Sequence, residues 1–515
     1  MAAGSRVSPG VYHSELDLSV YVPMLSSTIF GIVTTAKKGP TDSVTLITSE
    51  GQLFDVFGPP SPDHYGIYAA QQFLKEGNRL LVVRVAGYSE ATAQVEVQDE
   101  NESELAVTFR ASSSGSWANG ATTGVQVQID EGTRSNSYKI TIKYRGYVVE
   151  RYDSVVLTPT DSIDYIGTRL ADSKYVEVEH VTSVTTMKLG TYTLTGGDDG
   201  ASVTESDVVG TIAGGVKTGL KLFSNPEEVD VNLIAVPGDT RDGVISELIS
   251  IAEVRQDCLA LIDPPSGLDV QEVVDWHNGL GTNANDPKAP LSTSYASLSW
   301  PWIQVYDSWN DVDVWVPPSA FVSRHMALTD RDYEIWYAPA GLRRGRLADV
   351  LDVEYSPTLG EREYLYGGRA GEWGVNAINP FVKFQGLGIV RWGQRTLQRY
   401  PTALDRENVR RLLLYMRKII ATAVMYLVFE PNDPVMWSQF RSLVTPVLES
   451  IKSRRGIVDY QVVMDESTNT PEVRDRNEAV GLIYIRPTKA AEVIQIKFVI
   501  MPQGVTFQEV VTQGA

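Results

Sequence analysis

Three aspartates that follow apolar segments are the residues whose type and position could do chemistry. Asp239, Asp263 and Asp307 each come after a run that is typical of a buried strand, and polar residues at the carboxyl ends of such strands gather at one edge of an open α/β sheet. Two or three carboxylates together could hold a divalent cation. The adjacent Pro237 and Pro264 favour turns and helix caps instead, where aspartate is common. We therefore expect no catalytic residue, no metal site and no cofactor.

The remaining reactive residue types lack the spacing that chemistry needs. The five histidines are scattered, and none stands at metal-ligand spacing from another. Cys258, the single cysteine, cannot form an internal disulfide and lies in a segment typical of a core strand. No nucleophile elbow, phosphate loop or dinucleotide fingerprint is present. A serine, histidine and aspartate triad depends on geometry that the sequence does not reveal, so an α/β hydrolase with a β accessory domain stays an alternative.

Size and composition indicate a folded chain of several domains. The chain has 515 residues, of which 43% are hydrophobic and 21% charged, and this length allows roughly three or four domains. The first ten residues lack the apolar core of a signal peptide. The most apolar stretch, residues 419–429, is too short to cross a bilayer of about 30 Å. We expect a soluble protein that is made in a cytoplasm and does not insert into a membrane.

Charge is divided unevenly along the chain. The net charge is −19, yet residues 381–515 carry 18 Lys/Arg against 13 Asp/Glu, while the rest carries 27 against 51. An acidic body and a basic final region indicate two faces with different partners, although chance clustering on solvated faces is the alternative. Nucleic acid is a poor candidate partner, because no stacking platform or binding module accompanies the basic residues.

Both ends of the chain alternate with the period of a half-buried strand. Near the front, Tyr12, Ser14, Leu16 and Leu18 fall on one side of such a stretch, and at the back Val505, Phe507 and Glu509 alternate with their neighbours. A terminal strand with no partner nearby in sequence either folds back onto its own domain or pairs with the sheet edge of another chain. Two such arms favour pairing between chains.

Between the arms the pattern changes twice. Strands at 27–35, 80–85, 232–236 and 258–262 alternate with helices at 65–75, 242–256 and 269–280, which predicts a sheet covered on its faces. Two more strands are expected at 302–306 and 312–316. From about residue 91 to 200 the sequence is rich in Thr, Ser, Val and Gly, and short alternating runs at 125–129, 138–144 and 175–178 indicate an inserted all-β region.

The final region combines a strand–turn–strand at 384–392, two long helices at 405–429 and 435–451, and strands at 479–485 and 493–501. The apolar residues of both helices recur on one stripe. Basic side chains lie beside that stripe on the first helix and in the last turn of the second, where they suit the helix dipole. These basic residues are the candidates for a partner surface: Arg406, Arg410, Arg411, Arg417, Lys452, Arg454 and Arg455.

Short motifs in a fixed order resemble those of one protein family. The chain resembles the sheath proteins of contractile phage tails and related injection machines. The motifs include Pro9-Gly-Val-Tyr12, Gly115-Ser-Trp-Ala-Asn-Gly120, Asn232-Leu-Ile-Ala-Val-Pro-Gly238, Val316-Pro-Pro-Ser319, Ala338-Pro-Ala-Gly341, Asn408-Val-Arg-Arg-Leu412 and Phe429-Glu-Pro-Asn-Asp433. The pair His325-Met326 departs from the family pattern, which more often has small residues there, and this puts local packing in question.

The resemblance implies an α+β multidomain fold with a structural role. It implies an N-terminal β-arm (1–22), a middle α/β domain (23–90 and 206–380), an all-β outer insert (91–205), an inner C-terminal domain (381–503) and a C-terminal β-arm (504–515). The arms would complete sheets of neighbouring copies through Val11, Tyr12, Ser14, Leu16, Leu18, Val505, Phe507 and Glu509.

The same resemblance implies hexameric rings stacked around a tail tube. The basic candidates would face that tube, and the sheath would contract to drive it through a host envelope. The implied partners are further copies of the chain, the tube protein, and baseplate and tail terminator proteins, with the assembled protein in the virion tail after synthesis in the host cytoplasm. A bacterial injection system or tailocin is the related alternative.

Overall fold

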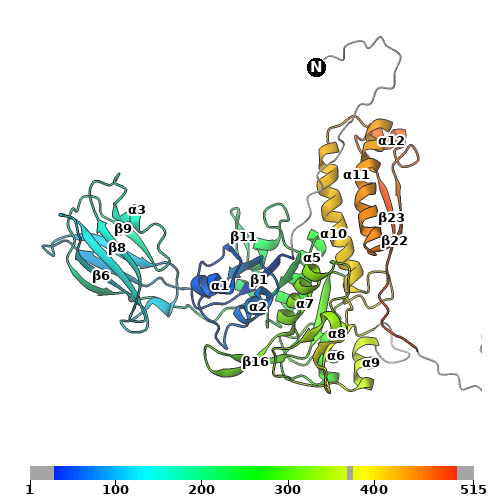
Figure 1. Cartoon of the computed structure of the whole chain (residues 1–515), viewed down its shortest axis with the longest axis horizontal. Coiled ribbons are helices and arrows are strands. Elements are labelled where there is room, and N and C mark those ends of the chain that lie inside the picture. Colours follow the sequence, from blue (N-terminus) through cyan, green and yellow to red (C-terminus); the bar gives the residue numbers. More distant parts are fainter. Residues whose placement is uncertain (1–27, 368–374, 496–515) are drawn as a thin grey trace, which may run out of the picture.

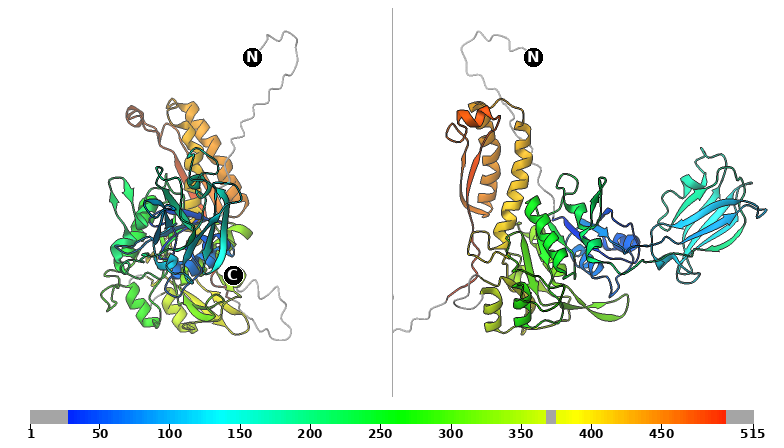
Figure 2. Two further views of the ribbon diagram at one scale, coloured as in Figure 1. Left: turned by 90° about the vertical axis from the view of Figure 1, so that its left-hand side faces the viewer. Right: turned by 180° about the vertical axis from the view of Figure 1, so that it is seen from behind.

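The computed structural model describes residues 28–367 and 375–495. Figure 1 shows three regions along its long axis: a β-rich region at one end, a central body, and a pair of long helices on the far side. Both views in Figure 2 show this helix pair projecting away from the body. The chain therefore has a mixed α/β multidomain fold, as the sequence predicts.

The body is built on a nine-stranded sheet whose central strands are parallel. Pairing is parallel from β3 across to β20 and antiparallel at the two ends. The central strands are buried, as expected when helices cover both faces of a parallel sheet. In spatial order the strands are β18 (Arg346–Leu347), β21 (Gly388–Arg391), β20 (Ile378–Phe384), β15 (Ala296–Trp300), β14 (Leu259–Ile262), β13 (Leu233–Ala235), β1 (Phe30–Thr34), β3 (Leu80–Arg84) and β2 (Val44–Ile47).

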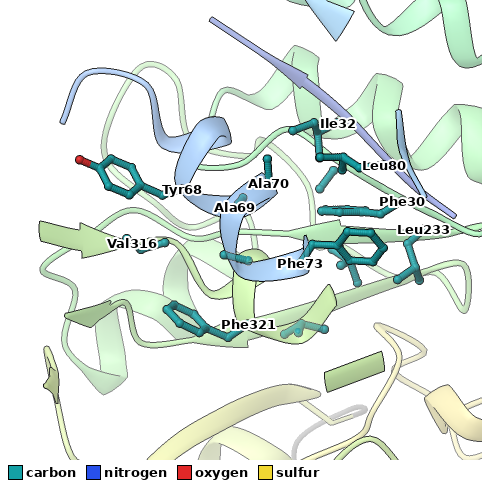
Figure 3. Packing of buried hydrophobic residues seen from close by; sticks show 14 of the residues in the cluster. Phe30, Ile32, Tyr68, Ala69, Ala70, Phe73, Leu80, Leu233, Val316 and Phe321 are labelled. Carbon is teal, nitrogen blue, oxygen red and sulfur yellow. The ribbon is translucent and has the colours of Figure 1, made fainter. Parts of the chain in front are cut away.

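The nine-stranded sheet separates the core of the body into two layers, each covered by helices. In one layer, residues of α2 and α7 pack on the sheet, and Phe30, Phe73 and Phe321 lie within it (Figure 3). The other layer is formed with α5 and α6. Burying one such aromatic ring contributes about 1.5–3 kcal/mol. The body helices are α1 (Glu50–Phe57), α2 (Tyr65–Leu74), α4 (Glu205–Val209), α5 (Asp242–Arg255), α6 (Val270–His277), α7 (Pro318–Asp332), α8 (Gly341–Arg344) and α9 (Leu359–Gly367), with the 3₁₀ turn η2 (Gly219–Phe223).

The strand order corrects two expectations and confirms two expected strands. β15 occupies a stretch for which the sequence predicted no strand. The hairpin β20–β21, expected to open the final domain, belongs to the nine-stranded sheet, because β20 pairs in parallel with β15. The expected strands at 302–306 and 312–316 are β16 (Ile303–Asp307) and β17 (Val312–Val316), and they form a separate sheet with β19 (Asp352–Val353).

The β-rich region has a hydrophobic core of its own between two sheets. The three predicted alternating runs are strands here. One sheet contains β4 (Gln94–Gln98), β5 (Leu105–Ala111) and β9 (Val176–His180), and the other contains β10 (Gly190–Thr193), β6 (Val125–Glu131), β7 (Tyr138–Tyr144) and β8 (Tyr147–Val155). Short elements in this region are η1 (Ser116–Ala118) and α3 (Ile166–Arg169), whereas the hairpin of β11 (Ile212–Ala213) and β12 (Val216–Lys217) lies beside the body (Figure 1).

A lysine from the body fills an aromatic cage in this β-rich region. The ammonium of Lys38 lies 5.5 Å from the ring centre of Trp117, 5.8 Å from that of Tyr144 and 5.3 Å from that of Tyr175. Burial lowers the pKa of Lys38 to about 8. The nearby Arg84 is buried and donates to the carbonyl oxygens of the same loop. The junction is therefore held by cation–π contacts as well as by chain continuity.

Two antiparallel helices and a small sheet form the projecting lobe. α10 (Glu407–Val424) leads away from the body, η3 (Met425–Leu427) follows, and α11 (Pro434–Ser453) returns. β22 (Ile457–Val463) and β23 (Leu482–Pro487) pair with each other and share a core with both helices, and α12 (Pro471–Asp475) lies between them in sequence. The predicted strand at 493–501 is not present over 493–495, and its remainder lies outside the described residues.

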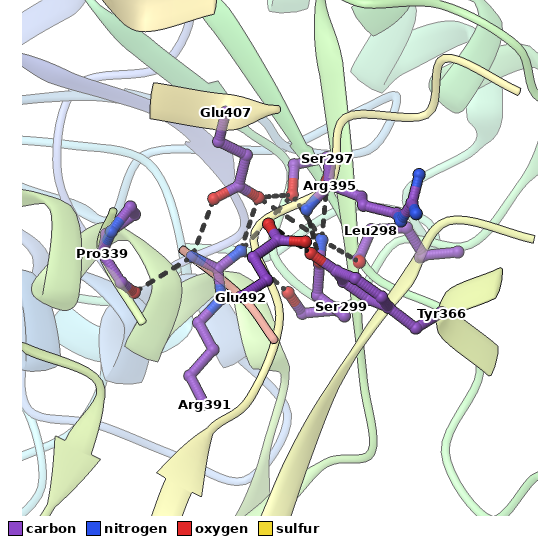
Figure 4. A network of polar contacts seen from close by, with 10 residues as sticks. Ser297, Leu298, Ser299, Pro339, Tyr366, Arg391, Arg395, Glu407 and Glu492 are labelled. Carbon is purple, nitrogen blue, oxygen red and sulfur yellow. Dashed lines mark hydrogen bonds and ion pairs between the residues drawn. The ribbon is translucent and has the colours of Figure 1, made fainter. Parts of the chain in front are cut away.

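A buried ion pair joins the first residue of α10 to the nine-stranded sheet. Figure 4 shows Arg391 of β21 donating two hydrogen bonds to Glu407, at 2.6 Å and 2.9 Å. Both side chains are fully buried. Ser297 of β15 also donates to Glu407. Since an unpaired buried charge is costly, this geometry fixes where the lobe leaves the body.

Two histidines are buried in the body. His277 on α6 and His325 on α7 are buried, and burial lowers the pKa of each to about 3. His325 lies with its ring 6.1 Å from that of Phe381, and the adjacent Met326 is fully buried. The pair His325-Met326, which departs from the family pattern, is therefore packed into the core.

Replacing Arg391 by Met lowers the free energy of unfolding by about 3–5 kcal/mol, because Glu407 is left buried and unpaired. Denaturant unfolding measures the loss, and hydrogen exchange across α10 locates it. The matched control is Arg391→Met combined with Glu407→Leu, which leaves no buried charge and recovers most of the loss. A single variant as stable as the wild type would show that the pair does not hold the lobe.

Lowering the pH should destabilise the folded chain, because the two buried histidines stay neutral in the folded state and become protonated in the unfolded state. The unfolded state takes up protons below about pH 6.5, whereas the folded state does not until the pH approaches 3, so stability is lost as pH falls. For each histidine the expected slope rises from about 0.7 kcal/mol per pH unit at pH 6.5 to about 1.3 kcal/mol per pH unit at pH 5. Denaturant titrations of wild type and of His325→Leu should differ by one such slope. Equal slopes would contradict this assignment.

Candidate assembly surfaces

The three aspartates at strand ends serve as turn and cap residues. Asp263 accepts hydrogen bonds from the backbone nitrogen and the hydroxyl of Ser319, at 2.7 Å and 2.6 Å, and burial raises its pKa to about 6. Asp307 accepts from Tyr68 at 2.6 Å, and Asp239 pairs with an arginine two residues on. Within residues 28–367 and 375–495, no three or more His, Cys, Asp or Glu side chains are grouped so that they could hold a metal ion.

None of the helices in the described part of the chain is both long and apolar enough to cross a bilayer.

The two-stranded sheet of the lobe has open edges. β22 and β23 pair from Ile457↔Pro487 to Val463↔Leu482, and no third strand joins them among the residues that the structure describes. One face of the sheet packs on the lobe core through Tyr460, Ile483 and Ile485. The other face leaves apolar side chains in solvent, with Tyr484 56% exposed. Unpaired backbone groups beside apolar side chains are a template for an added strand.

The structure divides the seven basic candidates into two groups. Arg410 and Arg411 are buried, so they cannot face a partner, and their proposed role is corrected. Arg411 pairs with Asp330 of α7, and Arg410 stacks over Tyr295 with its guanidinium 4.0 Å from the ring centre. The body encloses the N-terminal half of α10, including the side of the helix that a helical wheel assigns to solvent.

Arg406 is also engaged, because it holds the segment that follows β23. Its guanidinium donates to both carboxylate oxygens of Glu492 at 2.6 Å and 2.8 Å, and Tyr366 and Gln394 donate to the same carboxylate. Burial would raise the pKa of Glu492, but the hydrogen bond and charge of Arg406 outweigh it and hold that pKa below its usual range. Figure 4 shows Glu492 and Tyr366 beside the Arg391–Glu407 pair.

The remaining basic candidates lie at the surface of the lobe. Arg417 and Arg455 are exposed, and Lys452 and Arg454 are half-buried. Arg417 donates to Gln256 at the end of α5, while Arg454 pairs with Glu334 at 2.8 Å. These four residues remain able to contact a partner.

The candidate arm residues lie outside the described part of the chain. They are Val11, Tyr12, Ser14, Leu16 and Leu18 at the front and Val505, Phe507 and Glu509 at the back. The sequence analysis also missed Arg391, Glu407 and Glu492. A charged residue that ends an apolar strand, as Arg391 does, is the signal that could have pointed to a buried pair.

Two family descriptions match separate parts of the chain. Residues 400–501 match the phage tail sheath C-terminal domain, and residues 27–85 match the N-terminal region of domain III of the tail sheath protein Gp18. The first match covers the lobe, and the second covers β1, β2 and β3 with the helices between them.

Curated relatives include tail sheath proteins of two phages. The tail sheath protein of Enterobacteria phage T4 is 33% identical over 335 residues, which cover 62% of this chain and 48% of the relative. That of Vibrio phage KVP40 is 29% identical over 403 residues, covering 74% and 57%. The chain thus spans about half the length of the curated relatives it matches. These relatives are structural proteins rather than enzymes, as the sequence analysis expects for this chain.

Solved sheath proteins have a similar fold. The sheath tail protein of Listeria innocua gives a TM-score of 0.60 at 13% identity, over 90% of this chain and 95% of that protein. The sheath of an extracellular contractile injection system (PVC) in its contracted state gives 0.55 at 15% identity, over 96% and 98%. The matched domains and the phage relatives support a contractile phage tail sheath family for this chain, and the solved structures show a similar fold.

Proposed function

We propose that this chain is the repeating subunit of a contractile tail sheath. It polymerises as stacked hexameric rings around a tail tube in the virion, after synthesis in the host cytoplasm, and contraction of the sheath drives the tube through the host envelope. Baseplate and tail terminator proteins bind the two ends of the polymer. The observation that carries the proposal is the open two-stranded sheet of the lobe, because a chain that folded to act alone would gain nothing from such an edge.

The free energy of strand addition favours a polymer. A two-stranded sheet is marginal by itself, and each backbone hydrogen bond that an added strand makes contributes about 0.5–1.5 kcal/mol. Apolar side chains such as Leu482 and Tyr484 are exposed on this sheet and would be covered further. The terminal segments 11–18 and 505–509 have the alternating pattern that a strand at such an edge requires.

Phage relatives favour a phage tail over a bacterial injection system or tailocin. The curated relatives at 29–33% identity are phage proteins, whereas the injection-system sheath shares only 15% identity. An α/β hydrolase has no comparable support, because the aspartates at the strand ends are engaged by Ser319, Tyr68 and an arginine. Contraction would follow from a shift between two packed arrangements of the rings, with no catalytic residue required.

Removing residues 504–515, or the first twenty residues, abolishes long cylinders in negative-stain micrographs of the purified chain. The loss follows because the edges of β22 and β23 are then left without added strands. Circular dichroism and thermal unfolding should remain close to those of the full chain, since the deleted segments are proposed to pair only between copies.

A permuted arm provides the matched control for these deletions. Residues 505–510 keep their composition but lose their alternation of apolar and polar side chains, and the result should resemble the deletion. Cylinders that persist undiminished in both truncated chains would overturn the proposed role of the arms.

Basic side chains on the lobe are proposed to hold the acidic surface of a tube protein. Exposed ion pairs contribute only about 0–1 kcal/mol each, which suits a contact that must later release. Reversing Arg417 and Lys452 to Glu should weaken tube binding about tenfold at low salt, corresponding to about 1.4 kcal/mol, and leave cylinder formation intact. Co-sedimentation of tube with sheath measures the change. The matched control reverses Arg151 and Arg169, which are exposed on the β-rich region. Equal binding by both variants would exclude the electrostatic contact.

A further inference from the structure

The loop between α10 and α11 presents a group of apolar side chains to solvent. Phe429 is fully exposed (102% of its reference area), Tyr426 is 80% exposed and Val428 is 60% exposed. We call residues 425–430 the knob. It lies at the end of the lobe that is farthest from the body (Figure 1). Exposed aromatic side chains gathered at one point are typical of an interaction surface.

The chain holds this loop in a fixed shape. Asp433 caps α11 by accepting from two backbone nitrogens, each at 2.9 Å. Asn432 accepts from the indole nitrogen of Trp437 at 2.8 Å and donates to the carbonyl oxygen of Glu478 at 2.7 Å. Phe429 itself has a left-handed backbone (φ 74°), which is strained for a residue with a side chain. The side chain of Phe429 points into solvent.

A pocket of about 760 Å³ lies at the foot of the same lobe. Its apolar lining includes Trp336, Tyr337, Leu359, Trp392 and Val493. These residues come from the loop before α8, from α9, from the loop after β21 and from the segment that follows β23. We call this pocket the socket. Its volume and aromatic lining suit the side chain of a phenylalanine with its apolar neighbours.

The knob and the socket lie at opposite ends of α10. Asn408, in the first turn, lines the socket, whereas Met425 follows the last turn and begins the knob. A helix of 18 residues is about 27 Å long, so the knob cannot reach the socket of its own chain. A contact between two different patches of identical subunits is heterologous, and it extends into rings or helical polymers.

The charges around the two surfaces are complementary. The knob carries Glu430, and the cap Asp433 lies beside it. The socket is bordered by four basic residues and by two acidic ones, of which Glu492 is already paired with Arg406. The basic residues are Arg344, Arg362, Arg455 and Lys489. An acidic knob would thus meet a socket of net positive charge.

We propose that the knob of one copy inserts into the socket of a second copy of this chain. The contact rests on the proposed polymer and names a point at which adjacent subunits join, separate from the terminal arms. Phe429 is its central side chain, and the acidic residues beside it contact the basic rim.

Thiol crosslinking tests the contact in the full-length chain. Cys258 is buried, so Val428→Cys and Ala491→Cys introduce the reactive thiols, one on the knob and one on the socket, without removing Phe429. A short bismaleimide should convert the double variant into a ladder of covalent multimers under polymerising conditions and at high concentration in solution. A mixture of the two single variants should give dimers and no higher species.

Each result has a defined consequence. The contact is supported if adding Phe429→Ala reduces the yield of crosslinked multimers at least tenfold. The matched Tyr147→Ala on the β-rich region should leave that yield unchanged. Crosslinked dimers from Val428→Cys alone would indicate a symmetric contact and overturn the proposal. The absence of crosslinked multimers would also overturn the proposal. This includes the case where the chain's own C-terminal residues already protect the Ala491→Cys thiol in dilute monomers.

Micrographs of the uncrosslinked double variant separate this contact from the proposed function. Cylinders without a ladder would refute the knob and socket while the sheath role stands. A ladder without cylinders under any condition would refute the sheath polymer and leave the contact in place.

Discussion

The buried pair of Arg391 and Glu407 sets the geometry on which the rest of the chain depends. It ties the first residue of α10 to the nine-stranded sheet, and both partners lose their hydration to do so. A surface pair would tolerate many orientations, whereas two buried hydrogen bonds between planar groups tolerate few. The direction of α10 then determines where the open sheet and the knob are presented. Orientation, more than added stability, is what this pair provides.

Local patterns predicted the helices well, because apolar residues that recur with the helical period over eighteen residues are compatible only with a helix. α5, α10 and α11 lie within two or three residues of the predicted ends at most termini. β15 was missed because Ser297 and Ser299 interrupt its apolar run, and only the structure shows that Ser297 reaches the buried carboxylate of Glu407. Which strand pairs with which is a non-local property, so the hairpin at β20 was assigned to the wrong region.

The basic candidates show that a sequence pattern also does not reveal contacts between domains. A helical wheel assigns a face to solvent, but it does not reveal which half of a helix another domain encloses. Arg410 and Arg411 lie on the enclosed half of α10, and Arg417 lies beyond it. Turn chemistry was more informative where it is local: Asp239 and Asp307 each accept from the backbone nitrogen two residues on. Such a turn depends on neighbours in sequence, which is why it can be predicted, whereas Asp263 accepts from the backbone nitrogen of Ser319, which lies 56 residues away.

Strand addition and the knob would supply different properties to one polymer. Backbone hydrogen bonds are nearly independent of side-chain identity, so a strand at the edge of β22 or β23 can stay joined while the subunits turn against each other. The proposed knob contact would be specific, because a fixed loop would present Phe429 to one pocket of the next copy. A lattice with both could break the specific contact during contraction and keep the strands paired. The low cost of losing one aromatic contact, about 1.5–3 kcal/mol per buried ring, makes such a division physically reasonable.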